Sequence, residues 1–147
     1  MDVHQGNGTA SILQDDPSIF TLSIHGENNF PFKKEVGDLD CGLLDGCNDQ
    51  TYLQVLHQSL AELDSRFQPE FVIYLAGADP HEEDRLGRLN ISKEGMKKRD
   101  EAVFQYALDK QIPVAFAMAG GYGKTIESTV EIHCQTIATA LRYQQQY

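Results

Sequence analysis

Two short apolar runs, residues 71–76 and 112–118, constrain the fold of this chain more than any other feature of its sequence. Each has the length of a β-strand, and an unbroken apolar run is typical of a strand that is buried on both faces. Apolar residues recur at helical spacing in between and afterwards: from the Asn48–Asp49 N-cap to Phe67, over residues 93–110, and from about Thr125. Strands that alternate with helices favour right-handed βα units. We therefore predict an α/β fold with a parallel sheet.

The remaining segments complete a single domain over residues 1–147. A β-rich run at 20–24 predicts a further strand, whereas residues 27–48 show no sustained period and predict a long loop. Residues 143–147 are expected to form a frayed tail. Apolar residues at helical spacing predict that the last helix is amphipathic: Ile126, Val130, Cys134, Ile137, Ala138 and Leu141.

Charge and composition exclude several classes of partner. The formal net charge of −10 would repel a phosphate backbone, so we expect no nucleic-acid partner. No apolar run is long enough to span a bilayer, so we expect no membrane partner. The three cysteines form no CxxC pair and are expected to be free thiols, which favours a cytoplasmic location. Lys97-Lys98-Arg99 is interpreted as a solvated helix face.

Polar residues follow the predicted strands at positions that meet at one edge of a parallel sheet. Asp2 and His4 are two residues apart, so in an extended segment they point to the same side. With Asp79 they make a set of two carboxylates and one imidazole, which leaves a position open as catalytic zinc requires. Tyr122, flanked by glycines, can donate a hydrogen bond to an oxyanion there.

Three stretches, residues 2–9, 77–79 and 120–122, resemble the C-terminal motifs of the histone deacetylase superfamily. Residues 20–32 and 86–90 resemble its bacterial acetoin-utilisation-type and class IV-like members. The resemblance implies a three-layer, arginase/deacetylase-like parallel-sheet fold, incomplete here because only the C-terminal half is covered. It also implies zinc-dependent hydrolysis of acetyl-lysine or a related acetylated amine, with Zn2+ as the metal and Fe2+ as the alternative.

Carried over by motif, the resemblance assigns a role to each candidate residue. It makes Asp2, His4 and Asp79 the metal ligands and Tyr122 the residue that polarises the acetyl carbonyl. It also implies a structural monovalent cation, K+, held by Asp2, His4, Ser23 and Ile24.

The chain departs from the family in length, since family catalytic domains are about twice as long. None of its five histidines forms the tandem pair that serves the family as general base and acid. We therefore expect this chain alone to be nearly inactive, and to self-associate or pair with a separate N-terminal half. His81, in the loop after Asp79, is expected to be solvent-exposed rather than directed at the metal.

Three other functions were weighed against this interpretation. Residues 120–125 end in Gly-Lys-Thr like a phosphate-binding loop, but Met118 stands where that pattern needs its first glycine. A manganese hydrolase of the arginase group is disfavoured because no second Asp-x-His or Asp-x-Asp cluster lies in the right loop. A non-catalytic, metal-binding remnant that acts as an interaction or assembly module stays open as the alternative.

Overall fold

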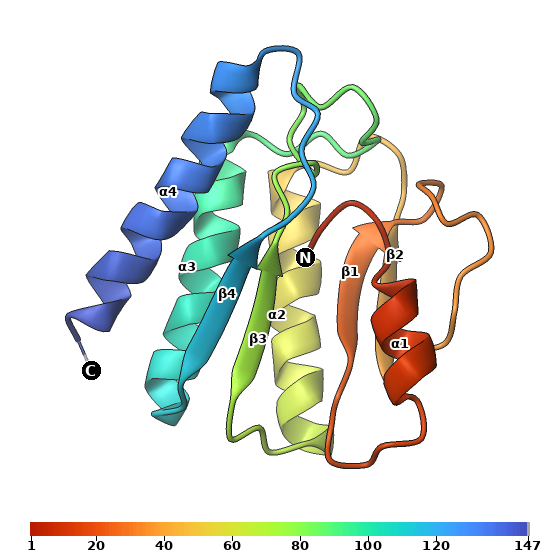
Figure 1. The fold of residues 1–147 in the computed structure, drawn as a ribbon, viewed down its shortest axis with the longest axis vertical. Coiled ribbons are helices and arrows are strands. Elements are labelled where there is room, and N and C mark those ends of the chain that lie inside the picture. The colour runs from red at the N-terminus through yellow and green to blue at the C-terminus, as the bar shows by residue number, and fades with distance from the viewer. Residues whose placement is uncertain (147) are drawn as a thin grey trace.

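The computed structural model describes residues 1–146, and its strands are all parallel to their partners (Figure 1). The elements follow one another as α1 (Asn7–Leu13), β1 (Leu22–Gly26), β2 (Leu39–Leu43), α2 (Asp49–Arg66), β3 (Val72–Ala76), α3 (Lys93–Lys110), β4 (Val114–Met118) and α4 (Ile126–Gln144). Strand β1 pairs with β2, and β3 pairs with β4. The predicted parallel α/β architecture is therefore confirmed.

The first three residues lie between the two strand pairs, as Figure 1 shows from the position of the N-terminus. The amino group of Met1 donates to the carbonyl of Leu75 in β3 at 2.7 Å. On the other side, the Gly26 N–H of β1 donates to the Val3 carbonyl at 2.9 Å. This short segment, which bends at Val3 and His4, thereby connects β3 to β1.

Each long helix begins at a side chain that accepts a hydrogen bond from the first turn. Asn48 caps α2, Ser92 caps α3 and Thr125 caps α4, each accepting from the backbone N–H three residues later. Such caps satisfy N–H groups that have no partner within the helix. Helix α2 packs on β1 and β2, α3 packs on β3, and α4 packs on α3.

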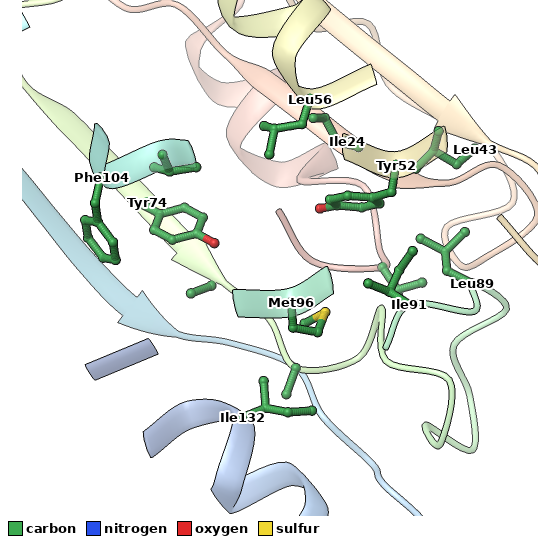
Figure 2. Packing of buried hydrophobic residues seen from close by; sticks show 14 residues of the cluster. Ile24, Leu43, Tyr52, Leu56, Tyr74, Leu89, Ile91, Met96, Phe104 and Ile132 are labelled. Atoms are coloured by element: carbon green, nitrogen blue, oxygen red, sulfur yellow. The ribbon is translucent and has the colours of Figure 1, made fainter. Parts of the chain in front are cut away.

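The hydrophobic core lies between the strands and these helices (Figure 2). Tyr52 and Leu56 of α2 are fully buried beside Ile24 of β1, and Tyr74 of β3 meets Phe104 of α3 edge to face at 5.9 Å. The cluster comprises Val3, Ile24, Leu43, Tyr52, Leu56, Tyr74, Ala76, Ala78, Leu89, Ile91, Met96, Val103, Phe104 and Ile132.

The prediction that both apolar runs are buried on two faces is wrong. In β3, Tyr74 and Ala76 face the helices, but Ile73 is 75% exposed and Leu75 is also exposed. In β4, Ala115 and Ala117, which pair with Ile73 and Leu75, are exposed as well. Among the described residues nothing covers the outer face of this strand pair, so only one face contributes to the core.

The last predicted helix forms as α4, but its apolar stripe does not face the core. The residues of α4 that are buried are Ser128, Ile132, Thr136 and Thr139. The apolar stripe points outward, with Ile126, Val130, Cys134, Ile137, Ala138 and Leu141 exposed. The small polar side chains pack inward because a buried polar group on α3 needs hydrogen-bond partners, and Thr136 supplies one.

Four smaller differences concern the other segments and the C-terminal tail. The segment predicted as a loop over residues 27–48 contains β2, whose Leu43 is buried. Short helix α1 was not predicted, and the strand expected at 20–24 lies two residues later. The predicted tail is helical to Gln144, and Tyr147 lies outside the described residues. In the part of the chain that the structure describes, no helix is both long and apolar enough to cross a membrane.

Candidate metal centre

The candidate metal ligands come from two segments that run beside each other at the carboxyl edge of the strands. Asp2 and His4 lie on the bent N-terminal segment that connects β3 to β1, and Asp79 lies in the loop directly after β3. The Val3 N–H, between the first two, donates to Asp79 Oδ1 at 2.8 Å. This bond fixes the two segments to each other and leaves the three polar side chains on the same side.

The three side chains converge on one point. His4 Nδ1 lies 2.8 Å from Asp2 Oδ1 and 3.1 Å from Asp79 Oδ2. One donor atom from each residue lies within 4.8 Å of the other two. Within residues 1–146 this is the one cluster of three such groups. The predicted set is brought together as an imidazole and two carboxylates.

The electrostatics of the cluster favour a cation. Burial, and then the negative charge of Asp2, raise the pKa of Asp79 to about 7. Burial also opposes the ionisation of Asp2, but the backbone N–H groups of His4 and Gly120 donate to its carboxylate and lower its pKa. Two carboxylates this close resist ionising together unless a positive charge lies between them. The donor set, its spacing and its charge therefore fit a divalent metal.

Two glycines allow the ligand segments to approach this closely. A Cβ atom on Gly77 would lie 2.7 Å from Asp2 Oδ2 and 2.7 Å from Asp79 Oδ1. A Cβ atom on Gly120 would collide with Asp79 Oδ2 and lie 2.8 Å from Asp2 Oδ2. The backbone of both glycines thus forms a wall of the ligand cluster, which no larger residue can provide without displacing the carboxylates.

Tyr122 lies on the loop after β4, whose first residues contact the ligand cluster. The Gly120 N–H donates to Asp2 Oδ2 at 2.9 Å, and the Gly120 carbonyl accepts from the Ala78 N–H. Tyr122 itself is 57% exposed, and its phenol has no hydrogen-bond partner among the described residues. Its role in catalysis stays a prediction.

Asp84 holds the Tyr122 loop in place, a role that the sequence did not reveal. Its Oδ2 accepts from the Tyr122 N–H at 2.5 Å, and its Oδ1 accepts from the N–H groups of Leu86 and Gly87. The Arg85 N–H also donates to the Tyr122 carbonyl. The available signal was an aspartate in a Gly-containing loop, which is common in ordinary turns.

The same loop does not form a phosphate cradle. Such a cradle needs free backbone N–H groups. The N–H groups of Gly120, Tyr122 and Gly123 donate to Asp2, Asp84 and Thr129 respectively. The Lys124 N–H donates to the Glu83 carbonyl. These bonds argue against nucleotide binding here.

The other predicted positions are placed as follows. Ser23 and Ile24 lie in β1, beside the ligand segment, and Ser23 Oγ lies 3.0 Å from His25 Nδ1. Their part in a monovalent-cation site stays a prediction. His81 was expected in solvent and is instead 4% exposed, because the loop after β3 folds back and pairs with Ile91. Burial lowers the pKa of His81.

A family model and several known proteins match most of this chain. The family model described as "Histone deacetylase domain" matches residues 1–138. An uncharacterized protein of Picosynechococcus sp. is 47% identical over 133 residues, covering 90% of this chain and 44% of the relative. Histone deacetylase 2 of Arabidopsis thaliana is 38% identical over 128 residues, covering 85% of this chain and 33% of the relative. The chain thus spans less than half the length of these relatives.

Solved structures show the same likeness in three dimensions. Acetylpolyamine aminohydrolase from Burkholderia pseudomallei has a TM-score of 0.80 at 20% identity, covering 95% of this chain and 42% of that one. An HDAC homologue complexed with SAHA has a TM-score of 0.75 at 25% identity, covering 99% of this chain and 40% of that one. The expected deacetylase-like α/β fold is therefore confirmed, with the chain holding about 40% of it.

Proposed function

Because the chain belongs to the histone deacetylase family, we propose that Asp2, His4 and Asp79 hold a divalent metal for the hydrolysis of an acetylated amine, acetyl-lysine or a related compound. The observation that carries the proposal is the convergence of one ligand atom from each of these three residues within 4.8 Å. Zinc (Zn2+) suits this donor set, and iron (Fe2+) is the alternative. Such a metal, when bound, supplies Lewis-acid polarisation of the acetyl carbonyl.

The chain's own residues add orientation and charge stabilisation to this chemistry. Asp2 and Asp79 are fixed by backbone N–H donors, so they keep their positions without rearrangement. Tyr122 is proposed to donate a hydrogen bond from its phenol to the acetyl oxygen as negative charge develops there. Its exposed ring, on a loop that contacts Asp2 at Gly120, is accessible to a substrate that approaches the sheet edge.

We also propose that the 147-residue chain hydrolyses amides slowly by itself. A general base must lie within hydrogen-bond reach of the attacking water. Of the described histidines, His4 belongs to the ligand set, and His25 and His81 are buried with partners of their own. His57 and His133 lie within helices α2 and α4. Loss of general-base catalysis typically lowers a rate by about 100- to 10,000-fold.

The predicted K+ site remains part of the proposal. The end of β1 lies beside the ligand segment, since the Gly26 N–H donates to the Val3 carbonyl. Ser23 and Ile24 belong to that strand, and Ser23 Oγ accepts from the Gly6 N–H at 3.5 Å, two residues after His4. The three free cysteines support the proposed cytoplasmic setting.

The metal and substrate proposals are tested together by titration. The metal-free chain is titrated with Zn2+ and with Co2+, and we expect one equivalent to bind and binding to be lost in Asp79→Asn. The metal-loaded chain is expected to bind SAHA, the compound bound to the homologous structure, and to cleave an acetyl-lysine peptide slowly. A chain that binds neither metal, or that binds metal but neither SAHA nor the peptide, contradicts the proposal.

A second function, assembly with another polypeptide, is favoured by the exposed apolar surface. A groove of about 430 Å³ lies between β4, α3 and α4, lined by Phe104, Pro113, Val114, Phe116, Ile137, Ala140, Leu141, Tyr143 and Gln144. The outer face of β3–β4 and the stripe on α4 are exposed as well. Apolar surfaces of this kind mark interaction sites. We propose that this surface binds a polypeptide equivalent to the part of its relatives that the chain does not match.

Co-expression tests this assembly. The chain is produced together with the portion of the Picosynechococcus relative outside the 133 matched residues, and a 1:1 complex is expected on sedimentation. Ile73→Ser combined with Leu141→Ser should weaken the complex, while Lys98→Ser, on the exposed side of α3, should not. Dimers of the chain alone would indicate a second copy as the partner, and a monomer at high concentration with no complex would refute assembly.

A further inference from the structure

A buried ion pair lies directly behind the ligand cluster. Arg99 and Asp100, neighbours on α3, both have fully buried side chains, and Arg99 Nη2 lies 2.8 Å from Asp100 Oδ1. The sequence predicted a solvated helix face for the Lys97–Arg99 run, and for Arg99 this is wrong. Buried charges are costly and tend to be retained where their hydrogen bonds specify a structure. The pair therefore calls for a structural explanation.

Asp100 fixes the pair to three elements. Its Oδ1 accepts from Arg99 Nε at 2.9 Å and from the Tyr74 hydroxyl of β3 at 2.5 Å. Its Oδ2 accepts from the Thr136 hydroxyl of α4 at 2.5 Å. The carboxylate is thereby held from α3, α4 and β3, so the guanidinium paired with it has little freedom to move.

Arg99 uses its remaining donor group on the two segments that carry the metal ligands. Its Nη1 donates to the Met1 carbonyl at 3.1 Å and to the Gly77 carbonyl at 2.6 Å. Met1 directly precedes Asp2, and Gly77 lies two residues before Asp79. One nitrogen thus bridges the backbone of both ligand segments from the side opposite their carboxylates.

We propose that Arg99 is a positioning residue of the metal centre, setting the separation of Asp2 and Asp79 through the Met1 and Gly77 carbonyls. This role rests on the proposed metal site. Burial opposes the charge of Arg99, but Tyr74 and Asp100 outweigh it and raise the pKa of Arg99, so the guanidinium stays charged. A planar guanidinium can serve Asp100 and two carbonyls at once, which a lysine ammonium cannot do in the same geometry.

The experiment separates positioning from general core stability. In Arg99→Met/Asp100→Asn the pair becomes neutral, and the asparagine can still bond Tyr74 and Thr136. The matched control is Thr136→Val, which removes one hydrogen bond from Asp100 and leaves the guanidinium bonds to Met1 and Gly77. Each folded chain is titrated with Co2+, whose visible absorption reports the coordination geometry.

We expect the double variant to bind Co2+ about 10- to 100-fold more weakly with an altered spectrum, as for other outer-shell partners of metal ligands. Thr136→Val should bind within about threefold of the unaltered chain. In the metal-free proteins, hydrogen exchange of the Val3 and Gly120 amides, which bond Asp79 and Asp2, should accelerate only in the double variant.

Several results would overturn the proposal. Equal weakening in the double variant and in Thr136→Val would assign Arg99 a general role in stability only. Unchanged affinity and spectrum in a folded double variant would exclude positioning. If the double variant does not fold, Arg99→Lys is titrated with Co2+ instead. An unchanged Co2+ affinity in Arg99→Lys would refute the positioning role. Failure of the unaltered chain to bind Co2+ would instead refute the metal site itself, and Arg99 would then have no centre to position.

Discussion

Replacing Gly77 by alanine should separate the two carboxylates of the ligand cluster. The added methyl group would lie 2.7 Å from Asp2 Oδ2, 2.7 Å from Asp79 Oδ1 and 2.8 Å from Asp2 Cα. Ordinary contact begins near 3.4 Å, so the neighbouring atoms must move by about 0.7 Å. Asp79 Oδ1 cannot move freely because it accepts the Val3 N–H, and Asp2 Cα belongs to the backbone.

The cost of this overlap sets the expected loss of metal affinity. Adding a methyl group to a tightly packed site costs about 1–3 kcal/mol. The metal-free protein can relieve the strain by letting the carboxylates separate, but ligand distances in a metal site tolerate only about 0.2 Å. Most of the strain therefore returns when the metal binds. A cost of about 1–3 kcal/mol corresponds to a roughly 5- to 150-fold larger dissociation constant.

Cobalt titration at constant pH measures this change. Gly8→Ala is the matched control, because a Cβ atom there meets nothing within 4 Å and the residue lies in α1. It should bind Co2+ like the unaltered chain and be slightly more stable. If Gly77→Ala folds and binds Co2+ with unchanged affinity, the two carboxylates do not share one ion, and the reasoning is refuted.

Three other outcomes follow from the contacts described above. Asp84→Ala should accelerate hydrogen exchange of the Tyr122 amide, because Asp84 accepts a hydrogen bond from that amide. Co2+ affinity should stay within about threefold, because Asp84 holds the loop and is not a metal ligand. An amide that exchanges as slowly as in the unaltered chain would refute this. Ser92→Ala should lower the free energy of unfolding by about 1–2 kcal/mol in urea, because Ser92 caps α3 and also bonds Asp49; a loss below about 0.5 kcal/mol would contradict it. Burial, and then the charge of Arg99, lower the pKa of His133 in the folded protein. The unfolded chain therefore binds more protons as the pH falls through about 6.5, so stability should fall there, and less so in His133→Gln; equal pH dependence of the melting temperature would exclude this.

The sequence predicted the positions of strands and helices better than it predicted which elements pack against one another. The apolar runs at β3 and β4 were found because their length and composition are local properties. The outward face of α4 was not, because periodicity shows which side of a helix is apolar and not what packs against it. Ser128 and Thr136 face inward because they bond Glu83 and Asp100, which are distant in sequence.

Some residues of the candidate site were likewise predicted from the sequence, and others were not. Asp2, His4 and Asp79 were predicted from residue type, from spacing and from the rule that parallel strands end at one edge. Arg99 and Asp84 were not, because each acts on backbone groups of another segment, at separations of 98 and 38 residues. Nothing in the local sequence distinguishes such a residue from a solvated charge.

The segment from Met1 to Val3 has two roles that use the same backbone, so the two roles are thermodynamically coupled. It joins β3 to β1, and it carries or flanks two of the three proposed ligands. An ion that binds only the closed arrangement adds RT ln(1 + [ion]/Kd) to the free energy of unfolding, about 2.7 kcal/mol at a concentration 100 times Kd. In that case, the metal is as much a folding cofactor as a catalytic one, and the melting temperature of the chain should rise with metal concentration.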